Sequence, residues 1–173
     1  DYGVTSSQKQ SDLNTAGYSS QTYAVGKSDN NFLIGGYSQV AISNALGNSW
    51  TYTSLNTLWG GLQFISGVAW NGSVWIVVGN SAKVATSPDG INWTDRTAAL
   101  AATGWGTSGI SDVIWDGTNF VIVGDGANAA ISANGSSWAR YSTGTALTAV
   151  AWTGTNLLAV GINGRVRRSA DGT

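Results

Sequence analysis

The feature that most constrains this chain is a spacing of glycines that recurs four times. In each copy, a glycine that ends an apolar run is followed 11 residues later by a second glycine in a turn-like segment. A tryptophan follows the second glycine by three residues in the first three copies. A repeat of this length is typical of propellers and solenoids. The glycine pairs are Gly36 and Gly47, Gly79 and Gly90, Gly124 and Gly135, and Gly161 and Gly172; the tryptophans are Trp50, Trp93 and Trp138.

Each copy also has the same internal order of segments. The leading glycines are 43, 45 and 37 residues apart. A short apolar segment comes first, then a turn such as Asn71-Gly72 or Asp116-Gly117, then a second segment rich in Val, Ile and aromatic residues. Runs this short between such turns predict hairpin-linked strands and not helices. Four strands per copy, repeated radially, predict the blades of a β-propeller.

We therefore predict an all-β fold, a small β-propeller of four blades with four antiparallel strands each, as a single domain over residues 1–173. The fourth copy stops before its outermost strand, and its missing tryptophan would fall at position 175. When the N-terminus is read on from Thr173, Tyr2 takes that position, so Tyr2–Ser6 is expected to supply the strand that closes the ring. The blades are expected over residues 23–54, 66–97, 111–142, and 148–173 with 1–6.

Two alternatives to this closure stay open at the level of sequence. The N-terminal strand could complete the ring of a neighbouring molecule, which would make a strand-swapped dimer. The chain could also be a fragment of a longer repeat array.

The turn that contains the second glycine resembles a known repeat. Ser87–Trp93 and Ser132–Trp138 resemble the Asp-box of BNR-type repeats, S-x-D-G-x-x-W, and Ser169–Gly172 looks like a truncated third copy. The first copy, Asn44–Trp50, keeps the glycine and the tryptophan but has Leu46 in place of the aspartate. The resemblance implies a propeller fold. It implies little about activity, because such repeats occur in sialidases, sorting receptors, assembly factors, and phage and bacterial surface proteins.

The residues of these boxes have a structural explanation. An Asp or Asn side chain can accept hydrogen bonds from backbone N–H groups of its own turn, and glycine supplies a positive φ. The tryptophan contributes a large apolar surface to the core. We therefore predict structural roles for Asp89, Gly90, Trp93, Asn134, Gly135, Trp138, Asp171, Gly172, Gly47 and Trp50.

Composition excludes several classes of partner. Charged residues are only 10% of the chain and the net charge is −1, so we expect neither nucleic-acid binding nor attraction to an anionic membrane. The longest apolar stretches are too short to cross a bilayer, and there is no cysteine. Low charge and many Ser, Thr, Asn and Gly residues predict an extracellular protein or one on a virion surface.

The missing residue types argue against an enzyme. The chain has no histidine and no glutamate, so a Ser-His-Asp triad cannot be built. Glycosidase chemistry would need two of the nine aspartates, several of which are expected in turns. Asp112, Asp116 and Asp125 match no calcium loop, so we expect no metal and no cofactor.

The candidate binding site comes from tryptophans outside the repeat pattern. Trp59 and Trp105 lie in the segments that connect successive blades, 11 and 10 residues before Trp70 and Trp115. Such rings could stack on a sugar or anchor a protein partner, or they could be buried under their connections. The loops that share this face supply the other candidates. The predicted ligand-binding set is Trp59, Trp105, Tyr141, Lys83, Asn80, Asp125, Asn128 and Arg165.

We therefore predict a non-enzymatic binding module that recognises a cell-surface glycan or a protein receptor, as in a phage tail fibre or bacterial surface protein. The alternative is a structural or decoration propeller that docks on neighbouring subunits of a virion or surface assembly. A sialidase-like hydrolase is kept as a third hypothesis only because the box motif occurs in that family. Loss of binding on removal of Trp59 and Trp105 would separate the first hypothesis from the second.

Overall fold

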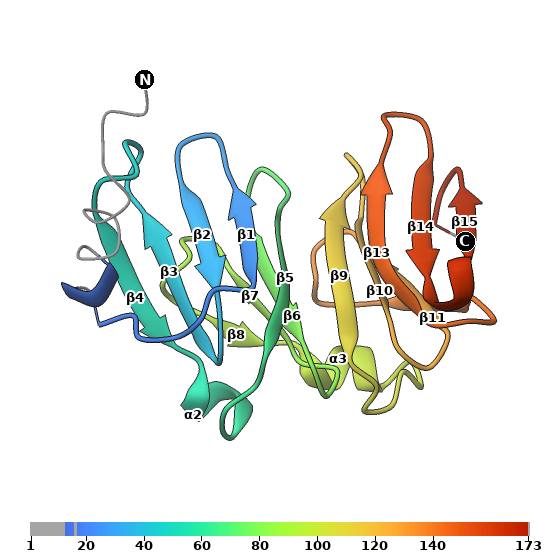
Figure 1. Cartoon of the computed structure of the whole chain (residues 1–173), viewed down its shortest axis with the longest axis horizontal. Helices are drawn as coiled ribbons and strands as arrows, with labels where there is room; N and C mark the ends of the chain where they lie inside the picture. The colour runs from blue at the N-terminus through green and yellow to red at the C-terminus, as the bar shows by residue number, and fades with distance from the viewer. Residues whose placement is uncertain (1–12, 16, 173) are drawn as a thin grey trace.

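The computed structural model describes residues 13–15 and 17–172, which form four antiparallel sheets in chain order (Figure 1). In each sheet the strands run from the inner to the outer position in sequence order. The first sheet contains β1 (Ala24–Lys27), β2 (Phe32–Gly35), β3 (Gln39–Ser43) and β4 (Trp50–Ser54), and the second contains β5 (Ile65–Trp70), β6 (Trp75–Gly79), β7 (Val84–Ser87) and β8 (Thr94–Asp95). The third contains β9 (Ile110–Trp115), β10 (Phe120–Gly124), β11 (Asn128–Ser132) and β12 (Ala139–Ser142), and the fourth contains β13 (Leu147–Trp152), β14 (Leu157–Gly161) and β15 (Val166–Ser169).

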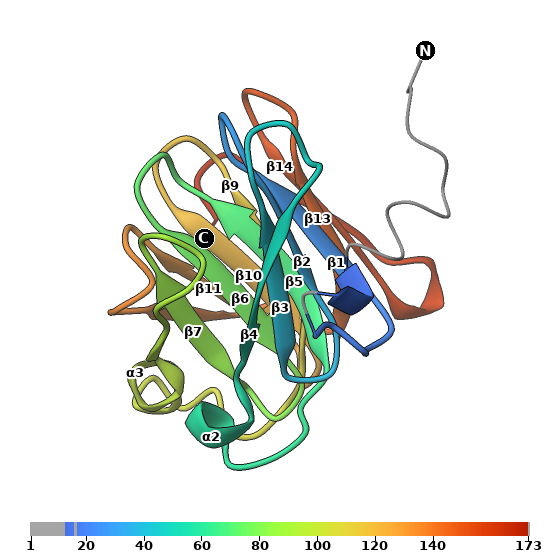
Figure 2. The ribbon, with the colours of Figure 1, turned by 90° about the vertical axis from the view of Figure 1, so that its left-hand side faces the viewer.

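Three short helices join these strands. The helix α2 (Asn56–Trp59) connects the first sheet to the second, and α3 (Thr97–Ala101) connects the second to the third. A 3-10 turn, η1 (Ile162–Gly164), joins β14 to β15. Both α2 and α3 lie at the same edge of the molecule, as Figures 1 and 2 show. No helix in the part of the chain that the structure describes is long and apolar enough to span a bilayer.

The sheets stack face to face, and alternate residues of a strand face opposite neighbours. In β6, Trp75 and Val77 pack into the interface with the first sheet, whereas Ile76 and Val78 pack into the interface with the third. All five residues of β6 are buried. This burial on both faces explains why the second strand of each repeat is a continuous apolar run and does not alternate with polar residues.

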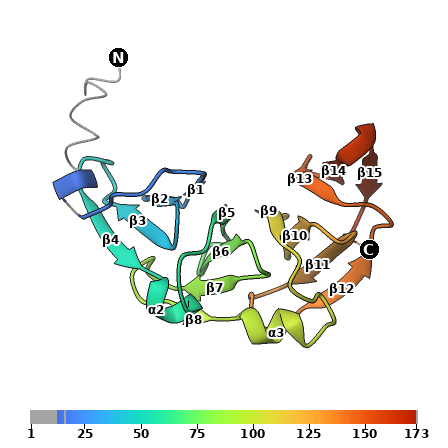
Figure 3. The ribbon, with the colours of Figure 1, turned by 60° about the horizontal axis from the view of Figure 1, so that its bottom comes forward.

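The four sheets form an open arc and not a closed ring (Figure 3). The inner strands β1, β5, β9 and β13 pack against one another in that order, and the first and fourth sheets lie at opposite ends of the arc. Bulky side chains such as Trp75 and Trp105 fill the interfaces between the sheets. The described residues do not close a ring, and closure by the N-terminal strand stays a prediction.

The fourth sheet has three described strands, β13, β14 and β15, and these agree with the part of the predicted blade that the structure describes. The predicted closing strand, Tyr2–Ser6, lies outside the described residues.

The leading glycine of each repeat is required by a close approach of the connecting segment. A Cβ atom on Gly124 would lie 2.2 Å from the carbonyl oxygen of Gly109, and one on Gly79 would lie 2.0 Å from that of Phe64. The pairing of β9 with β10 shifts register beside Gly124. The chain therefore enters each inner strand by passing over a position where only hydrogen fits.

The box of the second sheet is held by its own side chains. The Asp89 carboxylate accepts hydrogen bonds from the backbone N–H groups of Ile91 at 2.9 Å and Asn92 at 2.8 Å. The Ser87 hydroxyl accepts one from the Gly90 N–H at 2.8 Å, and Gly90 has a φ of +73°. These bonds fix the turn without any ligand.

The other two boxes repeat this arrangement. The Ser132 hydroxyl accepts a hydrogen bond from Gly135 N–H at 2.8 Å, and Asn134 Oδ1 accepts one from Ser136 N–H at 2.9 Å. The Ser169 hydroxyl accepts one from Gly172 N–H at 2.8 Å. Asparagine therefore performs the same local role as aspartate in this turn.

Candidate functional site

The two tryptophans predicted to bind ligand are part of the core. Trp59 is 3% exposed and packs with Leu55 between the first and second sheets. Trp105 is 2% exposed and packs with Leu100 between the second and third sheets. The prediction that these rings are available to stack on a ligand is wrong, and the alternative, burial under their connections, is confirmed. The helices themselves supply Trp59 from α2 and Leu100 from α3, whereas Leu55 and Trp105 come from the flanking residues of the connections.

The polar candidates tie loops to the connecting segments. Asn80 Oδ1 accepts a hydrogen bond from Phe64 N–H at 2.6 Å. Asn128 is buried, and its Oδ1 accepts a hydrogen bond from the Arg140 guanidinium at 2.7 Å. Arg140 also donates to the carbonyl oxygen of Thr103 at 3.1 Å. These contacts account for the two asparagines as structural residues.

The remaining candidates are distributed along the same edge of the arc. The backbone N–H of Asp125 donates a hydrogen bond to the carbonyl oxygen of Gly109 at 3.0 Å. The residue itself is exposed. Lys83 is half-buried and Arg165 is exposed. Tyr141 differs from them, because it lines a groove between the third and fourth sheets.

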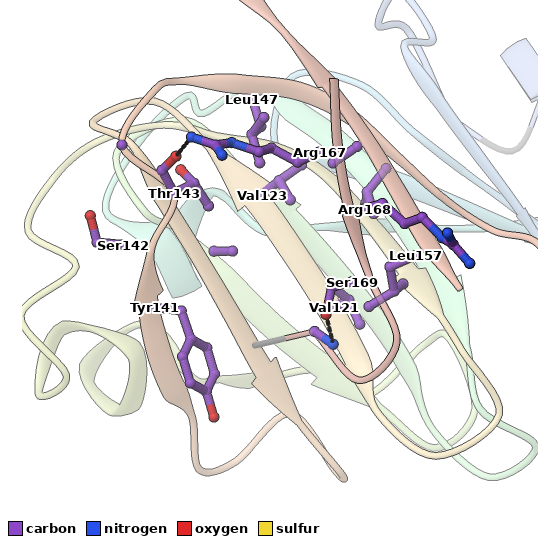
Figure 4. A pocket seen from close by; sticks show the side chains of 15 residues that line it. Val121, Val123, Tyr141, Ser142, Thr143, Leu147, Leu157, Arg167, Arg168 and Ser169 are labelled. Carbon is purple, nitrogen blue, oxygen red and sulfur yellow. Dashed lines mark hydrogen bonds between the residues drawn. The ribbon is translucent and has the colours of Figure 1, made fainter. Parts of the chain in front are cut away.

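This groove is the candidate functional site (Figure 4). Its volume is about 470 Å³. The floor is apolar and comes from strands of both sheets, whereas the rim carries hydroxyl groups and arginines. The floor residues include Val121, Val123, Leu147, Leu157 and Ala159, and the rim residues include Tyr141, Thr143, Arg167 and Arg168.

The groove occupies space that aromatic side chains fill in the other two interfaces. Each of those interfaces receives a leucine and a tryptophan from a connecting segment, and the tryptophan of a box packs against it as well. Between the third and fourth sheets, the connection over residues 143–146 has no large side chain, and the described part of the last box ends at Gly172. The filling residues elsewhere are Leu55, Trp59 and Trp93 in the first interface, and Leu100, Trp105 and Trp138 in the second.

The rim of the groove is positively charged and is bounded by the outermost described strand. The Arg167 guanidinium reaches across to donate to the carbonyl oxygen of Thr143 at 3.1 Å, as Figure 4 shows. Its strand, β15, pairs with β14 and is the outer strand of the fourth sheet among the residues described. The groove therefore lies beside a sheet edge, where an added strand could pair.

A second cavity of about 560 Å³ lies along the inner strands. Trp70, Trp115 and Trp152, the last residues of β5, β9 and β13, line it together with Lys27. These tryptophans are not among the predicted ligand-binding residues, although each directly precedes a turn in its repeat. Trp70 packs on Trp75 with ring centroids 5.0 Å apart, so its role is explained by packing.

Asp112 is half-buried, and its environment is structural. Burial raises the pKa of its carboxyl group, while hydrogen bonds from backbone N–H groups oppose that rise. One oxygen accepts from Val150 N–H at 2.9 Å and the other from Val113 N–H at 2.8 Å. The side chain therefore links β9 to β13. No cluster of three potential metal ligands occurs among residues 13–15 and 17–172.

Comparison with known proteins identifies the fold but no family. No family model and no curated protein matches the sequence. A computationally designed protein, Ika4, is 11% identical with a TM-score of 0.66, over 87% of this chain and 91% of that one. YCF48 bound to a D1 peptide is 13% identical with a TM-score of 0.69, over 89% of this chain and 53% of that one.

A third similar structure is a named propeller. The β-propeller domain of Cps50 (Swd1) from Myceliophteria thermophila is 13% identical with a TM-score of 0.61, over 88% of this chain and 52% of that one. The present chain thus spans about half the length of YCF48 and of the Cps50 domain. At these identities the similarities establish a β-propeller type of fold, and nothing more.

Proposed function

We propose that this chain is a non-enzymatic binding and assembly module that holds an extended polypeptide segment in the groove between its third and fourth sheets. One observation carries the proposal. The groove is open at the position where two equivalent interfaces are filled by tryptophans, and it lies beside the outermost strand β15. A segment that adds to β15 gains main-chain hydrogen bonds and can place an aromatic side chain in the groove.

The chemistry of the groove suits such a segment. Its floor is formed by aliphatic side chains, which favour an aromatic or aliphatic residue of the partner. The rim offers the Tyr141 hydroxyl and the Arg167 guanidinium to polar groups. Among the similar structures, YCF48 has been solved with a peptide bound, which supports a polypeptide as a ligand class for a fold of this kind.

This proposal favours assembly with a protein partner over recognition of a glycan. The glycan hypothesis depended on exposed rings at Trp59 and Trp105, and both rings are buried. The absence of a catalytic role remains part of the proposal. It is supported by the lack of histidine and glutamate and by the structural use of Asp112. We also propose that the turns are of the Asp-box kind and that the protein works outside the cell, the latter on composition alone.

A labelled peptide with the sequence of the chain's own outer strand, Trp50–Leu55, is a suitable probe because equivalent strands complete the other sheets. Fluorescence polarisation should show saturable binding to the full chain. Ala159→Phe, which fills the groove from β14, should abolish binding. The matched control Ala151→Phe, on an exposed position of β13 in the same sheet, should leave binding unchanged.

A second peptide, in which serine replaces the tryptophan, tests the role of the aromatic ring independently of any protein variant. It should bind at least tenfold more weakly, since a buried aromatic residue supplies most of the apolar contact. Equal binding of both peptides, or equal loss of binding in the Ala159→Phe and Ala151→Phe variants, would contradict the proposal.

A further inference from the structure

We infer that Asn163 is a site of spontaneous modification, at which the asparagine loses ammonia and becomes aspartate or isoaspartate. This site is separate from the groove and does not depend on the proposed function. Asparagine followed by glycine is especially reactive in this way, because glycine has no side chain to shield its backbone nitrogen. The chain contains three such pairs, Asn71-Gly72, Asn134-Gly135 and Asn163-Gly164. The structure distinguishes the third from the other two.

The reaction needs an asparagine side chain that can turn toward the nitrogen of the next residue. Base removes the proton from the glycine nitrogen, which attacks Cγ of the asparagine and forms a bond to it. The bond from Cγ to Nδ2 breaks, and the amide nitrogen takes up a proton from water and leaves as ammonia. Water then opens the cyclic succinimide that remains. Attack of water at Cγ gives aspartate, and attack at the main-chain carbonyl carbon gives isoaspartate. Hydrogen bonds that fix the side chain or the glycine nitrogen oppose the first step, because they must break before it.

Asn134 is held at both groups by its box turn. Its Oδ1 accepts hydrogen bonds from the Ser136 N–H at 2.9 Å and from the Ser136 hydroxyl at 2.7 Å. The Gly135 N–H, which carries the nitrogen that would attack, donates to the Ser132 hydroxyl at 2.8 Å. The box turn must therefore open before Asn134 can react.

Asn71 is held at its side chain, in the turn that joins β5 to β6. Its Oδ1 accepts hydrogen bonds from the Ser73 N–H at 3.0 Å and the Val74 N–H at 2.7 Å. Asp116 accepts two equivalent bonds in the same turn of the third sheet, so the anchored side chain belongs to the repeat. Rotation of the Asn71 carboxamide toward Gly72 would break both of its bonds.

Asn163 lacks such an anchor. It lies in η1, between β14 and β15, and is exposed. Its side chain makes no hydrogen bond with any residue among 13–15 and 17–172. A Cβ atom on Gly164 would meet nothing within 4 Å, so no neighbouring atom crowds that residue. The side chain is therefore free to rotate toward the Gly164 nitrogen without the loss of a bond.

The exposure of Asn163 is a property of this turn and not of the place of the fourth sheet in the arc. Ser81 and Gly126 take the same place between the second and third strands of the two central sheets, and both are exposed. The values of φ at Ser81, Gly126 and Asn163 are all positive, at +54°, +72° and +57°. Glycine and asparagine adopt this left-handed conformation more readily than other residues. The turn geometry thus favours an Asn-Gly pair, and the reactivity follows from that pair.

Both products alter the turn that leads into β15. Aspartate places a carboxylate two residues before Arg165. Isoaspartate takes the main chain through Cγ and adds one carbon to it before Gly164. The Arg165 N–H donates to the carbonyl oxygen of Ile162 at 3.3 Å across this turn, and the added carbon changes the distance between those two groups. We therefore expect isoaspartate to disturb the start of β15.

Peptide mapping by mass spectrometry tests the inference on the full chain. The folded protein is incubated at mildly alkaline pH in water labelled with heavy oxygen, so that only a succinimide opened during the incubation takes up the label. Asn163 should acquire label at least tenfold faster than Asn71 or Asn134. In urea, where the turns are unfolded, the three rates should become similar. Equal rates in the folded chain, or a higher rate at Asn71 or Asn134, would overturn the inference.

A serine substitution tests whether hydrogen bonding is the cause of the difference. Ser132→Ala removes the acceptor of the Gly135 N–H and should raise the rate at Asn134 at least threefold. Ser142→Ala, at an exposed serine of β12, is the matched control and should leave that rate unchanged. Neither substitution should change the rate at Asn163. An unchanged rate at Asn134 in a Ser132→Ala chain that is folded by circular dichroism would overturn the explanation by hydrogen bonding, and the inference with it.

Discussion

At the scale of single residues, the role of a side chain depends on whether it faces a turn, an interface between sheets or the groove. Asp89 and Asn134 hold equivalent turns through acceptor oxygens, so charge is not needed for the geometry. Trp59 and Trp105 have a different role, because each fills an interface between two sheets. Polar side chains in this chain mostly hold loops through hydrogen bonds, and aromatic side chains mostly fill the interfaces between sheets.

Asp89→Asn should reveal the electrostatic part of the box turn. Hydrogen bonds from Asn92 are the largest cause that holds the pKa of the Asp89 carboxyl well below its usual range. A lowered folded-state pKa stabilises the protein above the unfolded-state pKa of about 4, and the contribution is lost as the pH falls through the folded-state value. Since Asp89 is exposed, we expect the variant to lose at most about 1 kcal/mol at neutral pH. Urea unfolding from about pH 7 down to pH 2 should show this difference shrinking, and a difference independent of pH would contradict it.

Trp59→Ala and Trp105→Ala should behave as core substitutions. Removal of a buried tryptophan costs about 3–5 kcal/mol in unfolding free energy, because it removes apolar burial and leaves a cavity. Leu62→Ala, at a leucine that is 70% exposed near the same connection, should change stability by less than about 0.5 kcal/mol. Chemical denaturation measures all three. Unchanged stability in either tryptophan variant would mean that its ring does not fill the interface.

At the scale of elements, the unit of construction is a sheet plus the connection that enters the next sheet. The two glycines of each repeat have different structural roles in this unit. The leading glycine lets the connecting backbone pass directly over the second strand, and the glycine of the box supports a left-handed turn. The helices α2 and α3 are too short to stand alone, and each is held by one buried residue, Trp59 in α2 and Leu100 in α3.

Gly124→Ala should be much more costly than Gly117→Ala. A Cβ on Gly124 would lie 2.2 Å from the carbonyl oxygen of Gly109, so the backbone of the connection would have to move. A Cβ on Gly117 would meet nothing within 4 Å, and only its φ of +100° opposes the change. We expect losses of about 3 kcal/mol or more for Gly124→Ala and about 1–2 kcal/mol for Gly117→Ala. Thermal or urea unfolding compares them, and equal losses would show that the close approach does not matter.

At the scale of the whole molecule, stability should vary along the arc, because each sheet packs mainly on its neighbours in the chain. The second strands of the two central sheets are buried on both faces. The fourth sheet has a neighbour on one face, an open groove on that side, and exposed aliphatic residues on the other. The fourth sheet is therefore expected to be less protected than the two central sheets.

Hydrogen exchange should detect this gradient. Amides of β6 and β10 should exchange at least a hundredfold more slowly than those of β15. Equal exchange rates in the three strands would contradict the gradient.

The periodic glycines, the turns and the apolar strands could all be predicted from sequence because they depend on contacts within a few residues. The strand order within a sheet follows from the same local hairpins. The candidate site could not be predicted in this way: the four-residue helix at Asn56–Trp59 is too short for its amphipathic face to be read from a periodicity. Tyr141 was selected, but the groove that it lines depends on side chains absent from one interface and present in two others.

The sequence by itself determined the repeat, the four-sheet architecture and the structural role of the box turns, since each is set by local backbone geometry and hydrogen bonding. Only the tertiary structure decided that Trp59 and Trp105 are buried, that the sheets form an open arc, and that a groove remains beside β15. These properties depend on the volume of side chains that meet from distant parts of the chain. That volume sets how closely neighbouring sheets approach one another.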